Sequence, residues 1–377
     1  MHELLVIGFW VGLMTPIAVY VGYPAFVLAL SRLTKGRRFA IDPTSPWPSV
    51  TVAIAVHNEE RDIARAIRSV LAEDYPGQLS LLAGLDGCTD GTRSVVEGFS
   101  DRRVGFLDLA RQGKAATDNS IVAAASSDVI VTTAAGGELE PGTLRRLVGP
   151  FRDPLIGCTT GRFAPRQDGT IATGGSGLYW RMEYVIMAAE SKLGLLAAAS
   201  GTCMAHRRSV FRPIPEDSDG DVFIAPNAIL QGARVVFVSD AIVHDDGPAK
   251  METVLRGQRR MALRAIPATC GVTVRLLRRH PNVAFALVMH KLLRWFAPFF
   301  GILWAISAIG LIAAGDSAYT VVTAALLGVG AVAAVAASVV APRLRGAVIS
   351  FGLVQVAFVL ATIDVVRGRR ARMWNRA

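Results

Sequence analysis

Hydrophobic and polar positions alternate along the chain with two different periods. Between residues 50 and 243, short apolar runs are separated by longer stretches in which apolar positions recur every three or four residues. The short runs are typical of buried strands, and the longer stretches are typical of helices that pack on a sheet. The predicted strands are 50–56, 79–86, 104–109, 128–134, 156–163 and 233–243, and the predicted helices are 59–72, 91–99, 115–126, 141–150 and 176–196. This alternation indicates an α/β domain with a mostly parallel sheet.

Four other segments are almost continuously apolar. They are 4–30, 296–314, 319–340 and 347–366, and about 20 apolar residues suffice to cross a bilayer. The first segment is longer than the core of a signal peptide and has no small-residue cleavage site before its basic flank. We therefore expect an integral membrane protein with one span before the α/β domain and about three after it.

The net charge of +10 is concentrated beside these apolar segments. Basic clusters lie at 32–38, at 343–345 and at 367–376, which favours a membrane surface over a nucleic acid as the partner of these charges. The positive-inside rule places the flank 32–38 and the domain behind it in the cytoplasm. Three spans after a cytoplasmic domain would place the basic tail 367–376 outside the cell, which conflicts with the same rule. The number of C-terminal spans therefore stays open.

Polar side chains follow the first two predicted strands at the point where each strand ends. The carboxyl ends of parallel strands meet at one edge of the sheet, where ligands of open α/β folds bind. We expect one crevice there, in which carboxylates accept hydrogen bonds from a ribose or a base. The alternative is that Asn58 and Asp90 only cap the next helix or turn. The polar residues at the two strand ends are His57, Asn58, Glu59, Asp86, Thr89 and Asp90.

A series of motifs follows in order between residues 50 and 300. They are VHNEE at 56–60, DGCTDGT at 86–92, GKAATDN at 113–119, LEPGTLRRLVGPFRDP at 139–154, YWRMEY at 179–184, GTCMAHRRSVF at 201–211, SDGDVFIAPNAILQGARVVF at 218–237, RGQRRMALRA at 256–265 and HKLLRWFAP at 290–298. Their order resembles that of a membrane-bound family 2 glycosyltransferase. The resemblance implies a GT-A fold, which is a Rossmann-like, mixed, mostly parallel α/β sheet domain flanked by transmembrane and interfacial helices.

The resemblance divides the chain into four parts. A span with its basic flank at 1–38 precedes a cytoplasmic GT-A domain at 39–250. Interfacial amphipathic helices follow at 251–298, and transmembrane helices with a basic tail follow at 299–377. The segment 288–296 combines basic and aromatic residues in a way that suits the level of the lipid headgroups.

The resemblance also implies roles for individual residues. Asp221, eleven positions before Gly232, matches the catalytic base. Read without the resemblance, Asp221 would be an acid in a surface turn, and the arginines near residue 260 would face anionic lipid. The residues implied in nucleotide-sugar binding are His57, Glu59, Asp86, Lys114 and Asn119, and those implied in diphosphate binding are Arg256, Gln258, Arg259 and Arg260.

The chain departs from the family at the metal motif. An Asp-x-Asp normally ends the strand before LEP, but Ala134 and Gly136 stand at these two positions. Neither side chain can ligate Mg²⁺ or Mn²⁺, which take carboxylate oxygens, so the sequence does not support either metal as a cofactor. Glu138 and Glu140 lie one turn further on, and Glu140 is more typical of a cap on the next helix. Further departures are Gly220 before Asp221, and Met261 and Ala262 in place of an Arg-Trp pair.

Glu183 and Glu190 lie seven positions apart on one face of the predicted helix 176–196. Acids at this spacing either line a path for an acceptor or lie on the exposed face of the helix. The exposed face is the more typical location.

Two hypotheses about function follow. The first is an inverting membrane glycosyltransferase that moves a sugar from a nucleotide donor, a UDP-sugar by resemblance, to a lipid or polysaccharide at the cytoplasmic face. Membrane lipids and an envelope-synthesis protein are its expected partners. The second is a catalytically silent relative that binds a nucleotide sugar or a partner synthase, which the missing metal ligands favour. A transporter is disfavoured because the spans contain few ionisable residues.

Overall fold

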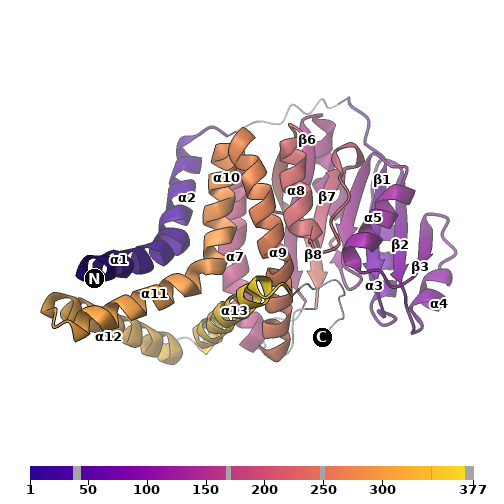
Figure 1. Cartoon of the computed structure of the whole chain (residues 1–377). Coiled ribbons are helices and arrows are strands. Elements are labelled where there is room, and N and C mark those ends of the chain that lie inside the picture. The colour runs from indigo at the N-terminus through magenta and orange to yellow at the C-terminus, as the bar shows by residue number, and fades with distance from the viewer. Residues whose placement is uncertain (37–43, 167–170, 247–250, 341, 370–377) are drawn as a thin grey trace.

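The computed structural model describes residues 1–36, 44–166, 171–246, 251–340 and 342–369 (Figure 1). The predicted basic residues 37–38 and most of the basic tail lie outside these ranges. Within them, eight strands form one sheet in the order β3-β2-β1-β4-β7-β6-β8-β5. The strands are β1 (Val50–Val56), β2 (Leu79–Asp86), β3 (Val104–Leu109), β4 (Val129–Thr133), β5 (Glu138–Leu139), β6 (Ile156–Pro165), β7 (Cys203–Arg207) and β8 (Arg234–Asp245).

The strand directions bring many loops to one edge of the sheet. β3, β2, β1 and β4 run parallel to one another. β7 runs antiparallel to both of its neighbours, β4 and β6, and β8 runs parallel to β6. The carboxyl ends of β1, β2, β4, β6 and β8 therefore meet the amino end of β7 at the same edge.

Helices cover both faces of the sheet. All seven residues of β1 are buried, which explains its unbroken apolar sequence. Val52 and Ile54 pack in the same core cluster as α3, whereas Ala53 and Ala55 pack in the cluster of Ile121 from α5. The helices nearest the sheet are α3 (Ile63–Leu71), α4 (Thr92–Glu97), α5 (Lys114–Ala124), α6 (Thr143–Val148), α7 (Ile171–Leu193) and α8 (Gly220–Leu230). The predicted mixed, mostly parallel α/β sheet is confirmed.

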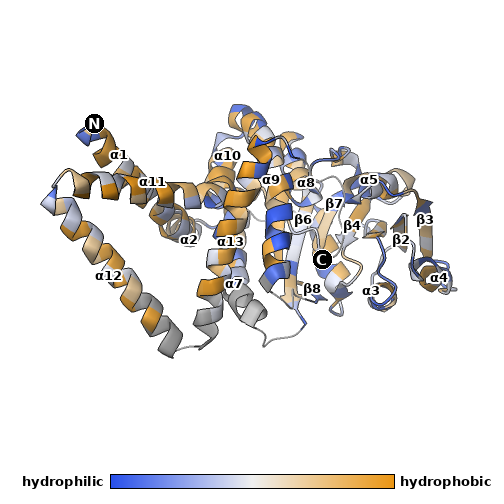
Figure 2. Cartoon of the chain, turned by 60° about the horizontal axis from the view of Figure 1, so that its bottom comes forward, coloured by the Kyte–Doolittle hydropathy of each residue, from blue (hydrophilic) through white to orange (hydrophobic). Residues whose placement is uncertain are grey.

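The apolar helices extend away from the sheet (Figures 1 and 2). Three helical segments, His2–Leu33, Pro281–Ala313 and Val348–Val366, are long and apolar enough to cross a membrane. The described apolar part of the remaining predicted span, Ser317–Val332, is shorter. The helices of this region are α1 (His2–Ile17), α2 (Tyr23–Leu33), α9 (Met251–Arg279), α10 (Pro281–Leu287), α11 (Leu293–Ala313), α12 (Ser317–Val340) and α13 (Pro342–Val366).

α1 lies along α11, and glycine allows their close approach (Figure 1). A Cβ atom at Gly12 would lie 2.5 Å from the backbone nitrogen of Trp304. Small residues at such contacts are typical of helices that associate in membranes, because they let the backbones come together. Helical turns of the π type at Ala18–Gly22 and Val288–Leu292 join α1 to α2 and α10 to α11.

A buried ionic cluster connects α7 to the start of α11. Glu183 and Glu190 are 1% and 2% exposed, so the prediction that they lie on an exposed face is wrong. His290 bridges them, with Nε2 3.1 Å from Glu183 and Nδ1 2.9 Å from Glu190. Arg294 Nη1 lies 2.8 Å from Glu183, and Lys291 pairs with the same carboxylate. The basic side chains predicted at headgroup level are thus turned into the protein, because α7 supplies their counter-charges.

Replacing Glu183 with Ala removes the carboxylate shared by three cationic side chains. Breaking a buried ion pair from one side costs about 3–5 kcal/mol, so we expect a lower unfolding temperature for the protein in detergent. Glu252→Ala is the matched control, because Glu252 makes an exposed pair with Arg256 whose loss costs little. Equal unfolding temperatures for the two variants would contradict the structural role of the cluster.

Candidate active site

The loops after β1 and β2 are hydrogen-bonded to each other at the shared edge. His57 Nδ1 lies 2.7 Å from the carbonyl oxygen of Asp86. The backbone N–H of Glu59 donates to Thr92 Oγ1 over 2.8 Å. The residues predicted to meet at this edge are therefore adjacent, as the parallel strand order requires.

Two of these polar residues make local loop and helix-end contacts. Asn58 has a positive φ of 55°, and its Oδ1 accepts the N–H of Thr89 over 2.8 Å. Asp90 Oδ1 accepts the N–H of Thr92, the first residue of α4, over 3.0 Å. The alternative of a cap on the next helix or turn fits the contact of Asp90 at the start of α4, whereas the side chain of Asn58 joins the two loops to each other.

Asp86 is fully buried and fixes the start of α5. Its carboxylate accepts the backbone N–H of Gln112 over 2.6 Å and that of Gly113 over 3.1 Å, and it pairs with Arg111. Gly113 has a φ of 91°, which a side chain would disfavour, and it immediately precedes α5. Asp86 thereby sets the position of Lys114. The predicted contact of Asp86 with a nucleoside stays a prediction.

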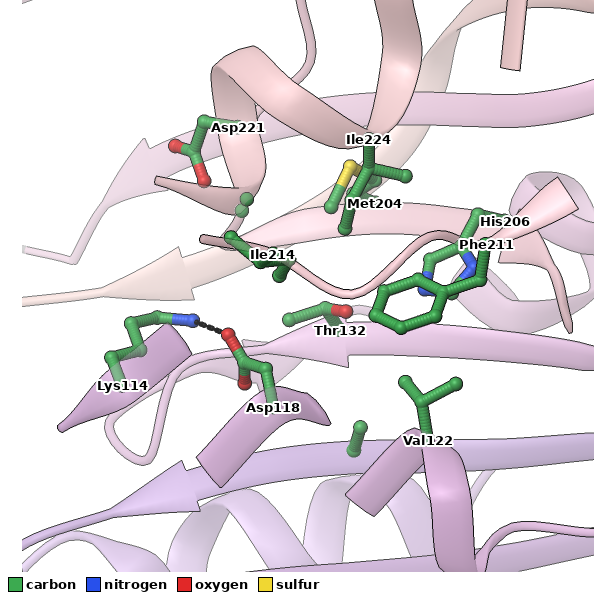
Figure 3. Close-up of a pocket in the computed structure, with 13 residues that line it drawn as sticks. Lys114, Asp118, Val122, Thr132, Met204, His206, Phe211, Ile214, Asp221 and Ile224 are labelled. Atoms are coloured by element: carbon green, nitrogen blue, oxygen red, sulfur yellow. Dashed lines mark hydrogen bonds and ion pairs between the residues drawn. The ribbon is translucent and has the colours of Figure 1, made fainter. Parts of the chain in front are cut away.

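Lys114 and Asp221 line opposite sides of a small pocket beside this edge (Figure 3). Lys114 Nζ lies 2.7 Å from Asp118 Oδ2, one turn along α5. Burial disfavours the charge on Lys114, but Asp118, Asp219 and Asp221 outweigh it and raise the pKa of the ammonium group. Lys114 is therefore a cation at neutral pH. Asp118 was not singled out from the sequence, because a carboxylate within a helix is usually exposed.

Asp221 lies in the first turn of α8 with an unusual electrostatic environment. Burial and the neighbouring carboxylate of Asp219 raise the pKa of Asp221 to about 6, while Lys114 and the N–H of Gly201 favour its charged form. The carboxylate lies so close to Gly201 that a Cβ atom there would overlap it. A carboxylate with such a pKa can exchange protons near neutral pH.

The side chain of Asn119 makes two hydrogen bonds to the backbone of one residue. Its Nδ2 donates to the carbonyl of Ile214 over 2.9 Å, and its Oδ1 accepts the N–H of Ile214 over 2.8 Å. Asn119 thus holds the segment before α8, and its predicted contact with a donor stays a prediction.

The residues of α9 that are predicted to bind the diphosphate contact different parts of the protein. Arg256 pairs with Glu252 on the same helix, and Arg259 Nε lies 2.7 Å from Asp364 Oδ2 on α13. Burial lowers the pKa of Arg260, while the carboxylate of Asp219 opposes this shift. Gln258 is half-buried. The predicted contacts of these residues with a diphosphate stay predictions.

The end of β4 lacks the carboxylates of a metal site. The turn after β4 contains Ala134 and Gly136, and among the described residues no group of three or more His, Cys, Asp or Glu side chains could hold a metal ion. The described residues do not fit the metal implied by the resemblance. Instead, Arg166 Nη2 donates to the carbonyl of Gly136 over 2.5 Å. Arg166 lies outside every motif, so no sequence pattern pointed to it.

Glu140 does not cap α6. Its Oε1 lies 2.7 Å from His244 Nε2, whereas the N–H of Leu144 in the first turn of α6 donates to Glu73 Oε2 over 2.9 Å. The predicted cap at Glu140 is therefore wrong, because a residue distant in sequence occupies the helix end.

Replacing Asp86 with Ala removes the acceptor of two backbone N–H groups and the carboxylate that pairs with Arg111. We expect a loss of about 3 kcal/mol in unfolding free energy and faster amide hydrogen exchange through residues 112–118. Asp108→Ala removes an exposed pair with Arg93 and serves as the control. Unchanged exchange in residues 112–118 of the Asp86 variant would show that Asp86 does not hold the start of α5.

Comparisons with known proteins agree with this geometry. Residues 51–214 match the model of the family Glycosyl transferase family 2. The chain is 26% identical over 261 residues to an N-acetylglucosaminyltransferase of Rhizobium meliloti (strain 1021), covering 64% of this chain and 61% of that protein. It is 24% identical over 237 residues to an N-acetylglucosaminyltransferase of Rhizobium leguminosarum bv. viciae, covering 58% and 56% of the two chains. The chain thus spans less than two thirds of the length of these relatives.

A solved structure shows the fold over nearly the whole chain. The mannosyltransferase PcManGT from Pyrobaculum calidifontis, in complex with GDP-Man and Mn²⁺, superposes with a TM-score of 0.72 at 21% identity. The match covers 96% of this chain and 100% of PcManGT, so the apolar helices are included in the shared fold. Residues 51–214 are therefore similar to a glycosyl transferase family 2 domain, and the chain has a GT-A-like fold.

Proposed function

We propose that this protein is an inverting glycosyltransferase that moves a sugar from a nucleotide-sugar donor to an acceptor at the membrane. The observation that carries the proposal is the Asp221 carboxylate, which faces a pocket beside the ligand-binding edge of the sheet. Its pKa of about 6 suits a general base at neutral pH.

In the proposed reaction, Asp221 takes the proton of the acceptor hydroxyl as the hydroxyl oxygen attacks the anomeric carbon of the sugar. The bond between that carbon and the diphosphate oxygen breaks, and its electron pair leaves with the nucleoside diphosphate. Cations near the departing oxygen stabilise its charge. Lys114, on the opposite side of the pocket, and Arg260, beside Asp219, are suited to this purpose.

The donor and acceptor are proposed from chemistry and from similarity. The two rhizobial relatives are named N-acetylglucosaminyltransferases, which supports a UDP-linked N-acetylglucosamine donor. Three apolar helices long enough to cross a membrane favour a lipid or a growing polysaccharide as acceptor. The basic flank after the first of them favours transfer at the cytoplasmic face of the cell membrane by a multi-pass protein.

A second candidate is a catalytically silent protein that binds a nucleotide sugar. Ala134 and Gly136 in place of two carboxylates favour it, because metal-dependent transfer needs ligands there. The two candidates differ in whether a bound donor is turned over.

The pH profile tests the base. Because Asp221 acts only when deprotonated, turnover of the wild type should fall as the pH drops below about 6. Asp221→Asn should lower turnover about 100-fold or more while donor affinity changes little. Asp74→Asn, which alters an exposed acid, should retain activity. Normal turnover by the Asp221 variant would remove this residue from the mechanism.

Gly201→Ala tests the position of the base without changing its chemistry. A methyl group at residue 201 must displace the Asp221 carboxylate, so turnover should fall about 100-fold, the effect of losing a positioned base, with donor affinity retained. Gly271→Ala on α9, where a Cβ atom meets nothing within 4 Å, is the matched control. Equal activities would show that the contact between Gly201 and Asp221 does not matter for transfer.

A further inference from the structure

Two arginines lie where the family 2 metal motif is missing. Arg166 follows β6, and its Nη2 donates to the carbonyl of Gly136 and, over 3.3 Å, to that of His244 at the end of β8. Arg65 projects from α3 into the same cluster, because both guanidinium groups approach Glu138. The chain therefore places one cation, Arg166, at the carbonyl of the residue that replaces the second carboxylate of the motif, and a second cation, Arg65, near the same acid, Glu138.

The two arginines share weak ion pairs with the same two acids. Arg65 lies 3.9 Å from Glu138 and 3.5 Å from Asp246, and Arg166 lies 3.7 Å and 3.9 Å from these carboxylates. These nitrogen–oxygen distances are longer than hydrogen bonds. Glu138 and Asp246 are 44% and 47% exposed, so both can turn towards water.

Each guanidinium also has unused hydrogen-bonding capacity. The Nε atoms of Arg65 and Arg166 are buried and lack a hydrogen-bond partner. One stronger contact, 2.8 Å from Arg65 to Asp62, anchors Arg65 to its own helix. An anion that displaces Glu138 and Asp246 would therefore find two anchored cations with free donors.

The cluster lies at the ligand-binding edge of the sheet. Gly136 follows the carboxyl end of β4, where Thr133 pairs with Cys203 of β7. Cys203 lies two residues after Gly201, which contacts Asp221. The ends of β6 and β8, which carry Arg166 and Asp246, reach the same edge through their parallel pairing. The cations and the proposed base thus border the same site from different strands.

We propose that Arg166, with Arg65 beside it, binds the diphosphate of the donor in place of a divalent metal ion. This inference rests on the proposed function. Glu138 and Asp246 pair with the two cations and turn outward when phosphate oxygens replace them. Arginine suits this task because its planar fork donates two parallel hydrogen bonds to a phosphate. When the glycosidic bond breaks, the same donors stabilise the charge on the departing diphosphate.

The test is calorimetry of the full-length protein in detergent with UDP, GDP and uridine, in Mg²⁺ and in chelator. UDP or GDP should bind the wild type equally well in both solutions. Arg166→Ala should weaken this binding about tenfold or more, the loss expected for charge-assisted hydrogen bonds, and Arg166→Lys should restore part of it. Uridine has no phosphate, so its affinity should not change. Arg93→Ala, which breaks an exposed pair on α4, should bind like the wild type.

A second variant should bind the nucleoside diphosphate more tightly, which misfolding cannot produce. Glu138→Gln combined with Asp246→Asn removes the acids that compete for the two arginines, so it should tighten binding of the nucleoside diphosphate in chelator. If these acids instead held a metal, the same variant would weaken binding in Mg²⁺. Binding lost in chelator and unaffected by Arg166→Ala overturns this inference and leaves the proposed function intact. No binding of UDP or GDP to the wild type in either solution contradicts the proposed function itself.

Discussion

The buried carboxylate of Asp86 is the constraint on which the site depends. It ends β2 with no exposed surface, so its charge must be neutralised inside the protein. The N–H groups of Gln112 and Gly113 and the Arg111 guanidinium meet this need, and in doing so they fix where α5 begins. Lys114 and Asp118 then face the pocket because they occupy the first turns of that helix. A structural hydrogen-bond network thus sets the electrostatics around Asp221.

The apolar helices are connected to the sheet domain by charge as well as by packing. Glu183 on α7 binds Lys291 in the π-helical turn before α11 and Arg294 in the first turn of α11. Asp364 on α13 binds Arg259 on α9, which itself packs on α8 of the domain. Charges buried away from water persist only when paired, so these contacts hold the helices at defined positions against the domain. Under the proposed function, an acceptor would meet a site of fixed geometry.

The fold was largely predictable because it depends on local patterns. The six predicted strands form at the expected places, since a buried parallel strand needs a continuous apolar run. β7 was missed because it is short and contains His206 and Arg207, and β5 because it has only two residues. The site was less predictable. Three of the site and cluster residues pair with residues about 95 or more positions away in the sequence: Glu183, Asn119 and Arg259. The interest of Arg166 follows only from its hydrogen bond to the turn at Gly136. No local pattern encodes such pairings.

We propose that this domain transfers a sugar without the carboxylates of the family's metal motif. The most direct measurement is release of nucleoside diphosphate from a panel of nucleotide sugars by the purified protein, with Mg²⁺ or Mn²⁺ and with chelator. We expect release from a UDP-sugar that continues in chelator. Absence of release from every nucleotide sugar in every condition would contradict the account and favour a protein that binds its donor without turning it over.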